Sequence, residues 1–152
     1  MTDHLPLVHH VELWTDDLAL AERQWGPVLT ALGCEPFQHW QDGRSWRSGG
    51  SYIVIEQSPA LRPGGQDRMR AGINHLALRA PGRVRSAALR AVALSTGWAE
   101  RVDTGRALHL VDSQGFELEL VYDEAEGHGE GEGEPEDESA CGDAEADGAA
   151  RS

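Results

Sequence analysis

The sequence repeats one order of predicted secondary structure, and this repeat limits the folds open to the chain more than any other feature. Each copy reads as a strand, a helix and three further strands, judged from the spacing of apolar residues. The first copy covers residues 7–57 and the second covers residues 73–122, with a Pro- and Gly-containing linker at residues 58–72. The repeat therefore predicts an α+β fold of two paired βαβββ modules in one domain, residues 1–122.

The expected elements of each copy follow from local patterns. Residues 7–14 alternate in polarity, as a strand with one apolar face does. In the helix expected over residues 18–32, apolar residues recur at steps of three and four, and Thr15 or Asp16 is the expected cap. Pro27 is expected to kink or break this helix, because proline lacks the amide donor. The other expected strands are 36–40, 44–47, 52–57, 73–79, 98–102, 106–111 and 116–122, and the second helix is 83–95.

A histidine near the start and a glutamate near the end recur in both copies. His10 and Glu56 are separated by 46 positions, and His75 and Glu119 are separated by 44. The flanking residues repeat as well, because both histidines begin a His-apolar-x-Leu segment and both glutamates follow an apolar residue. Equivalent places in a repeat predict that the four side chains act together.

Strand alternation places these four side chains on polar faces, opposite the apolar faces that must pack under the helices. Two neutral imidazoles and two carboxylates balance a divalent cation and leave positions for water or substrate. A nitrogen and oxygen ligand set of this kind suits nickel, zinc, manganese, cobalt or ferrous iron. The predicted metal ligands are His10, Glu56, His75 and Glu119.

Five further side chains share the polar faces. Glu12 and Glu117 stand two residues from predicted ligands, where they can orient an imidazole, act as general bases or face water at the rim. Arg79 can pair with an anionic substrate group or with Glu117. Trp14 and Tyr52, together with Trp46, can line the cavity as an aromatic surface for an organic ligand, or they can pack in the core. The expected substrate-binding residues are Glu12, Trp14, Tyr52, Arg79 and Glu117.

Three other histidines of the repeat region lie outside this set. His9 has the opposite strand phase and is expected on the helix side, and His109 has no counterpart in the first copy. Both are therefore interpreted as structural. His39 stays open, because a strand beside the cavity can direct either it or Trp40 inward.

The composition excludes several classes of function. Twelve of the 26 acidic residues but one of the 13 basic residues lie in residues 123–152, a Gly- and Glu-rich tail expected to be disordered. The remaining body is nearly neutral and has no basic stripe, so no nucleic acid partner is expected. The chain has no apolar run of about 18 residues and no signal-peptide pattern, which predicts no membrane partner and a cytoplasmic location. The two cysteines are expected to be free thiols.

These motifs resemble those of the vicinal oxygen chelate superfamily, which includes glyoxalase, bleomycin-resistance proteins and dioxygenases. The resemblance covers residues 7–122 and implies a cupped half-barrel in which the paired modules surround the metal. The segments that carry it are HVEL at 10–13 followed by Asp17-Leu18, VIE at 54–56, GINHLAL at 72–78 and DSQGFELEL at 112–120.

The set of two histidines and two glutamates is most similar to that of metal-dependent glyoxalase. This resemblance implies a lyase or isomerase that acts on a small oxygenated metabolite through a metal-chelated enediolate, with Glu119, or alternatively Glu56, as the catalytic base. It also implies a homodimer. A thiol cosubstrate is left open, since no residues that would hold one are identified. The alternative is an antibiotic-resistance protein, either a fosfomycin thiol transferase or a bleomycin-sequestering protein.

Overall fold

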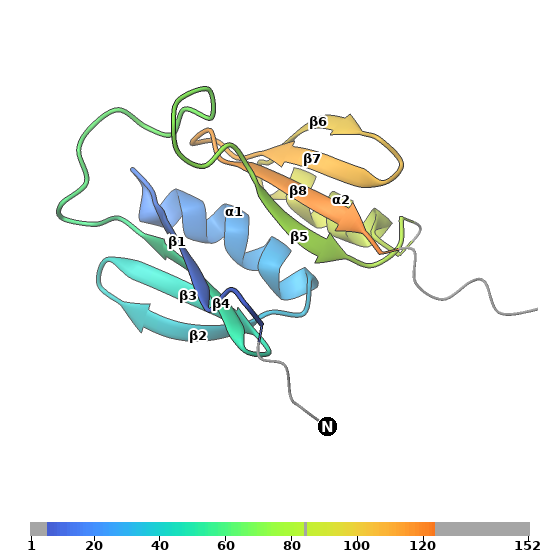
Figure 1. Ribbon diagram of the computed structural model, residues 1–152, viewed down its shortest axis with the longest axis horizontal. Coiled ribbons are helices and arrows are strands. Elements are labelled where there is room, and N and C mark those ends of the chain that lie inside the picture. Colours follow the sequence, from blue (N-terminus) through green and yellow to red (C-terminus); the bar gives the residue numbers. More distant parts are fainter. Residues whose placement is uncertain (1–5, 84, 124–152) are drawn as a thin grey trace, which may run out of the picture.

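The structure is a computed structural model that describes residues 6–83 and 85–123. Over these residues the chain forms two successive βαβββ modules, which confirms the predicted α+β fold (Figure 1). The first module contains β1 (His10–Trp14), α1 (Leu18–Ala31), β2 (Glu35–Trp40), β3 (Gly43–Ser48) and β4 (Ser51–Glu56). The second module contains β5 (Leu76–Ala80), α2 (Ala87–Ser95), β6 (Ala99–Asp103), β7 (Ala107–Val111) and β8 (Glu117–Tyr122).

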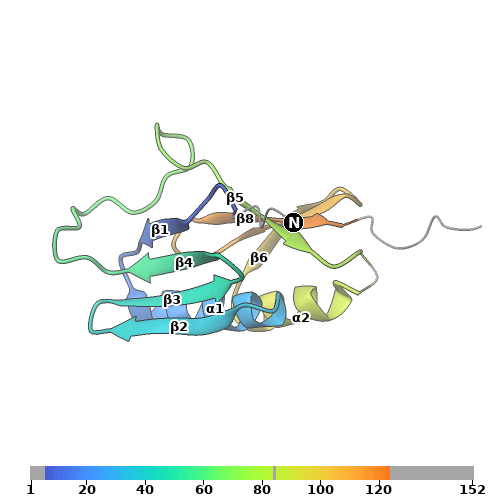
Figure 2. The ribbon, with the colours of Figure 1, turned by 60° about the horizontal axis from the view of Figure 1, so that its bottom comes forward.

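Each module forms its own four-stranded sheet. The strand orders are β1-β4-β3-β2 and β5-β8-β7-β6. β1 pairs with β4, and β5 with β8, in parallel, whereas the other neighbours are antiparallel hairpins. Both helices lie on the same side of the sheets and contact each other (Figure 2). β1 and β5 are therefore edge strands, and residues of both line one cavity at the seam between the modules.

Strand alternation separates an apolar face from a polar face, as predicted. On β1, Leu13 is buried while its neighbours Glu12 and Trp14 are exposed. On β8, Leu118 and Leu120 are fully buried. These leucines belong to one core cluster that also contains the buried sides of α1 and α2. The polar faces of the strands are thus turned away from the helices.

α1 continues past Pro27, where the sequence predicts a kink or a break. The residues that follow pack into the core, because Val28 and Leu29 are fully buried. Burying two such side chains contributes about 3–6 kcal/mol, which matches or exceeds the cost of about 3 kcal/mol for a proline in a helix interior. The predicted break is therefore wrong, since tertiary packing holds the helix together across Pro27.

Asp17 caps the N-terminus of α1. Its carboxylate accepts a hydrogen bond of 2.8 Å from the Leu20 amide, which is the bond that an N-cap side chain makes. The predicted caps, Thr15 and Asp16, are therefore wrong. The hydroxyl of Thr15 instead donates a hydrogen bond of 2.7 Å to Oε1 of Gln114, in the second module.

Three predicted elements begin three or four residues later than their patterns suggest. β1 begins at His10 instead of residue 7, β5 at Leu76 instead of residue 73, and α2 at Ala87 instead of residue 83. The hydroxyl of Ser86 donates to the carbonyl of Pro81, so the chain completes a turn before the helix begins.

The turn at residues 112–115 docks the second module on α1. The indole Nε1–H of Trp25 donates a hydrogen bond of 2.9 Å to Oδ2 of the buried Asp112. Gln24 is fully buried and exchanges hydrogen bonds with Ser113, at 3.0 Å to the hydroxyl and 3.1 Å from the backbone N–H. The modules are therefore joined by buried polar contacts as well as by the apolar core.

The acidic tail that the sequence predicts to be disordered lies outside the described residues, apart from Asp123. Cys141 lies in that tail, and Cys34 is a free thiol in the described part of the chain. Neither α1 nor α2 is long and apolar enough to cross a membrane.

Candidate functional site

The second module brings one predicted ligand pair into contact. Nε2 of His75 lies 3.0 Å from Oε2 of Glu119. The strand register places Ala77 opposite Glu119. His75 therefore lies two residues before the position that faces this carboxylate. Nδ1 of His75 lies 2.9 Å from the side-chain oxygen of Asn74, which orients the ring. The His75 and Glu119 side chains are 39% and 21% exposed, so a ligand can reach the pair from the polar face.

His109, which the sequence analysis interprets as structural, lies on the same polar face as this pair. The register of β7 and β8 places His109 directly opposite Glu119. Its Nε2 lies 3.9 Å from Oε1 of Glu119, and its Nδ1 lies 3.5 Å from Oε1 of Glu117. The signal that identifies His109 in the sequence is the hairpin turn at residues 112–115, which sets residues 109 and 119 opposite each other.

Glu117 is buried beside this pair instead of facing water at the rim. Its Oε2 lies 2.9 Å from Nη1 of Arg101, in β6, and 3.2 Å from Nε of Arg68, in the linker. Arg79, which was expected to pair either with an anionic substrate group or with Glu117, forms an ion pair of 3.0 Å with Asp123. Neither Arg68 nor Arg101 belongs to the repeated motif, so the sequence pattern does not identify them.

The first module keeps its two predicted ligands apart. The register of β1 and β4 places His10 opposite Tyr52 and Trp14 opposite Glu56. Four residues of strand separate these positions, which is about 13 Å at about 3.3 Å per residue. The His10 ring stacks on Tyr52 with a centroid distance of 4.9 Å, and its Nδ1 lies 2.9 Å from Nδ1 of His9. His10 and Glu56 therefore do not meet at one point.

Among the remaining aromatic side chains of the first module, the predicted position of His9 is wrong, and the structure gives the position of His39, which the sequence left open. His9 is exposed and contacts the Tyr52 ring edge-on at 5.3 Å. It does not face the helix, because β1 begins only at residue 10 and its alternation does not extend to His9. Trp46 is buried in the core, and it also lines a cavity together with Tyr52. His39 is exposed, while Trp40 is half-buried.

The donor chemistry fits a divalent metal, and the second module supplies part of the geometry. Imidazole nitrogen and carboxylate oxygen are ligands of zinc, nickel and similar ions, and His75 with Glu119 offers one of each in contact. Among residues 6–83 and 85–123, no three His, Cys, Asp or Glu side chains gather closely enough to hold a metal ion. The contacting pair therefore needs further ligands from elsewhere to complete a metal site.

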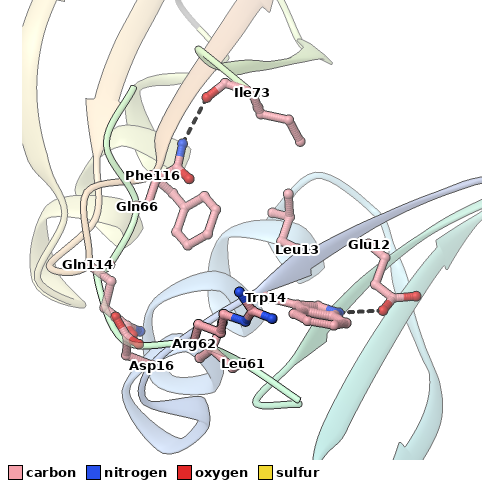
Figure 3. Close-up of a pocket in the computed structure, with 11 residues that line it drawn as sticks. Glu12, Leu13, Trp14, Asp16, Leu61, Arg62, Gln66, Ile73, Gln114 and Phe116 are labelled. Atoms are coloured by element: carbon pink, nitrogen blue, oxygen red, sulfur yellow. Dashed lines mark hydrogen bonds between the residues drawn. The ribbon is translucent and has the colours of Figure 1, made fainter. Parts of the chain in front are cut away.

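A cavity of about 360 Å³ lies between the end of β1 and the linker (Figure 3). Two of the predicted substrate-binding residues, Glu12 and Trp14, line it. The indole N–H of Trp14 donates a hydrogen bond of 2.6 Å to Oε1 of Glu12. Figure 3 shows Arg62 of the linker beside the indole of Trp14, with Phe116 across the cavity. The cavity thus combines aromatic surface with charged groups.

A more apolar cavity of about 560 Å³ lies at the seam between the modules. Tyr52 and Arg79, which are also predicted substrate-binding residues, line this seam cavity. Burial raises the pKa of the Cys34 thiol, which lines the cavity too, and this keeps the thiol protonated near neutral pH. The apolar residues that line the seam cavity include Val8, Val11, Ile53, Leu76 and Leu78.

Several solved structures share this fold. A "putative glyoxalase" from Bacillus halodurans has a TM-score of 0.69 and 27% identity, covering 77% of this chain and 96% of that chain. A glyoxalase/bleomycin resistance protein from Albidiferax ferrireducens T118 has a TM-score of 0.65 and 16% identity, covering 78% and 99%. The fosfomycin resistance protein FosX from Mesorhizobium loti has a TM-score of 0.51 and 17% identity, covering 80% and 92%. The last two similarities concern the fold alone.

One curated protein shares part of the sequence. The uncharacterized protein YqjT of Bacillus subtilis (strain 168) is 43% identical to this chain over 75 residues. The match covers 48% of this chain and 58% of that protein, so the chain spans little more than half of the relative's length. No family model matches the chain.

Proposed function

This chain has the fold of the vicinal oxygen chelate superfamily, and from that premise we propose that it is a divalent-metal-dependent lyase or isomerase of the glyoxalase type. Its substrate in this proposal is a small metabolite with two adjacent oxygens. The proposed ligands are His75 and Glu119, together with His10 and Glu56. Nickel, zinc, manganese, cobalt and ferrous iron all suit such a set.

The contact between His75 and Glu119 carries the proposal. Metal–ligand distances of about 2.0–2.2 Å place adjacent ligand atoms about 3 Å apart, and Nε2 of His75 lies 3.0 Å from Oε2 of Glu119. Asn74 already orients the imidazole, as the outer partners of metal-binding histidines do. The pair is therefore prepared to share one ion without rearrangement of the second sheet.

The side chains around this pair have distinct proposed roles. A bound divalent ion would polarise the two adjacent oxygens of the substrate. Oε2 of Glu119 contacts His75, so Oε1 is the carboxylate atom that would take a proton from the neighbouring carbon. His109, with Nε2 3.9 Å from that Oε1, limits where the carboxylate can turn. Glu56 is the alternative base.

We expect a homodimer to complete the site. In a single chain, His109 lies 3.9 Å from Glu119, but no three His, Cys, Asp or Glu side chains of the described residues lie closely enough to hold an ion. The other proposed ligands, His10 and Glu56, lie about 13 Å apart on the first sheet, so a second copy would present one of them across an open polar face without a change in its first sheet. Size-exclusion chromatography with light scattering should therefore give twice the chain mass of 16.5 kDa.

Metal binding by the purified full-length chain tests the proposal. The protein is stripped with chelator and titrated with nickel, zinc, manganese and cobalt, and its metal content is measured by mass spectrometry. H75A and E119Q should each weaken binding more than tenfold, because each removes a direct ligand. H39A is the matched control, since His39 is an exposed histidine on the far edge of the first sheet. Equal metal affinities of H75A and H39A, or no stoichiometric metal in the wild type, would overturn the proposal.

The separation of His10 from Glu56 favours a second candidate, a transferase that opens antibiotics such as fosfomycin. Superfamily members of that type typically use three ligands. If E56Q keeps the metal while H10A loses it, the transferase is favoured, and if both variants lose it, the lyase or isomerase is favoured. A thermal-shift screen against small dicarbonyls, thiol adducts and antibiotics then ranks the substrates, because stabilisation follows ligand affinity. Ligand binding in chelator without turnover would instead indicate a sequestering protein.

A further inference from the structure

Two arginines from separate segments converge on one carboxylate beside the His75–Glu119 pair. Arg101 of β6 and Arg68 of the linker both contact Oε2 of Glu117, at 2.9 Å and 3.2 Å. Glu117 and Glu119 are two residues apart in β8, so they occupy the same face of the strand. The two guanidinium groups therefore lie next to the proposed reaction centre.

The arginines, and not the acid between them, form the accessible surface. The side chain of Glu117 is 7% exposed, whereas those of Arg68 and Arg101 are 29% and 42% exposed. A guanidinium group has five N–H donors. In the part of the chain that the structure describes, each of these two groups forms its ion pair with Glu117 through one nitrogen and forms no other ion pair. A ligand that reaches this face thus meets free guanidinium donors.

The charge of the face also favours an anion. Glu117 and Glu119 carry two negative charges, which Arg68 and Arg101 balance, so the four groups are formally neutral. A divalent ion at the neighbouring His75–Glu119 pair would leave the face with a charge of about +2. A neutral ligand would not offset that charge, while a carboxylate would.

We infer that Arg68 and Arg101 bind the carboxylate of the substrate, which makes the substrate a small 2-hydroxy or 2-oxo carboxylic acid. The planar fork of arginine matches a carboxylate through paired N–H donors. Acids of this class carry the anion that the arginines bind and the adjacent oxygens that the proposed function requires. The inference rests on the proposed function for the reaction, but not for the binding of the anion. Glu117 holds the two guanidinium groups in place through its ion pairs with them.

A matched pair of ligands tests this inference by NMR titration of the full-length protein. Lactate and lactamide have the same shape and both carry a 2-hydroxyl oxygen, but only lactate is an anion. The wild type should bind lactate at least tenfold more tightly than lactamide. R68Q and R101Q should each reduce lactate affinity to that of lactamide. R106Q is the control and should keep the preference, because Arg106 is exposed and makes no ion pair within residues 6–83 and 85–123.

The titration is repeated with chelator and with bound metal, and every variant is checked by thermal unfolding. R101K keeps a cation beside Glu117 without the fork, so it replaces R101Q if that variant is unfolded, and it should weaken lactate binding at least threefold. Equal affinity of the wild type for both ligands, or a lactate preference that survives R68Q and R101Q, would overturn the inference. Metal binding without a lactate preference overturns only this inference. A lactate preference without stoichiometric metal overturns only the proposed function.

Discussion

Trp25 of α1 and Asp112 of the turn before β8 share a buried hydrogen bond of 2.9 Å that joins the two modules. Asp112 also accepts hydrogen bonds from the backbone N–H groups of Gln114 and Phe116, at 2.9 Å and 2.8 Å. One carboxylate thus fixes both the turn and its attachment to the first module. Because β8 starts directly after this turn, the bond also sets the position of the carboxylates on its polar face.

Removal of either partner is expected to destabilise the domain. W25F should lower the free energy of unfolding by about 1.5–3 kcal/mol, because a buried carboxylate oxygen loses its donor. D112N should have a similar cost, and the double variant should cost about 1–2 kcal/mol less than the sum. Urea unfolding measures these values, with W14F, which removes an exposed indole, as the control. Strictly additive costs would show that the two side chains are not coupled.

Gly115 is expected to tolerate no side chain. Its φ is +91°, and a Cβ there would lie 2.8 Å from the carbonyl oxygen of Gln66 in the linker. G115A should therefore combine a backbone cost of about 1–2 kcal/mol with an overpacking cost of about 1–3 kcal/mol. G105A is the matched control, since Gly105 has a φ of +80° but no atom within 4 Å of an added Cβ. Equal losses of unfolding free energy in the two variants would contradict the close contact.

Pro27 is expected to limit the stability of α1. In P27A the restored amide can donate to the carbonyl four residues earlier, which removes a helix penalty of about 3 kcal/mol. The greater freedom of the unfolded chain offsets about 0.4–1 kcal/mol of this gain. We therefore expect the free energy of unfolding, measured in urea, to rise by about 2–2.6 kcal/mol. P63A, in the linker, is the control and should show no gain in unfolding free energy. A lower unfolding free energy in P27A would contradict this expectation, because it would show that the packing of α1 requires the proline ring.

The thiol of Cys34 is expected to react slowly and to make stability depend on alkaline pH. Burial raises its pKa above the ordinary value, so the folded state holds the thiol proton more tightly than the unfolded state. The stability that this more tightly held proton contributes is fully present at pH values below the unfolded pKa of about 8.5. It is lost as the pH rises through the folded pKa. In a C141S background, iodoacetamide labelling at pH 8 should be slower when the protein is folded than in urea. Equal labelling rates would contradict the burial, and C34A should remove the alkaline loss of stability.

The repeat predicted most of the fold because its signals are local. Alternation in β1 and β8 depends only on neighbouring residues, and both strands bury the side that the pattern indicates. The effect of Pro27 could not be predicted in this way, because the burial of Val28 and Leu29 depends on a sheet that forms from distant segments. Local propensity therefore failed where tertiary packing is stronger.

The candidate site was predicted less completely, because contacts between strands depend on register. Both modules pair their parallel strands with the same offset of 42 residues, as in His10 with Tyr52 and Leu76 with Leu118. The spacings of 46 and 44 between histidine and glutamate therefore place His75 two residues, but His10 four residues, from the position opposite the carboxylate. The difference in spacing is visible in the sequence. Which histidine comes close to its glutamate can be predicted only when the strand register is known. Arg68 was missed for a similar reason, since a linker sequence does not show which sheet it covers.

The end of the linker is attached by hydrogen bonds to the segment that leads into the second module. The Gln66 amide donates to the carbonyl of Ile73 at 2.8 Å, and the Asn74 amide donates to the carbonyl of Arg68 at 3.0 Å. These two bonds hold Arg68 to the segment that leads into β5. The guanidinium group of Arg68 would therefore follow a movement of the second sheet, which carries Glu119, and not a movement of the first.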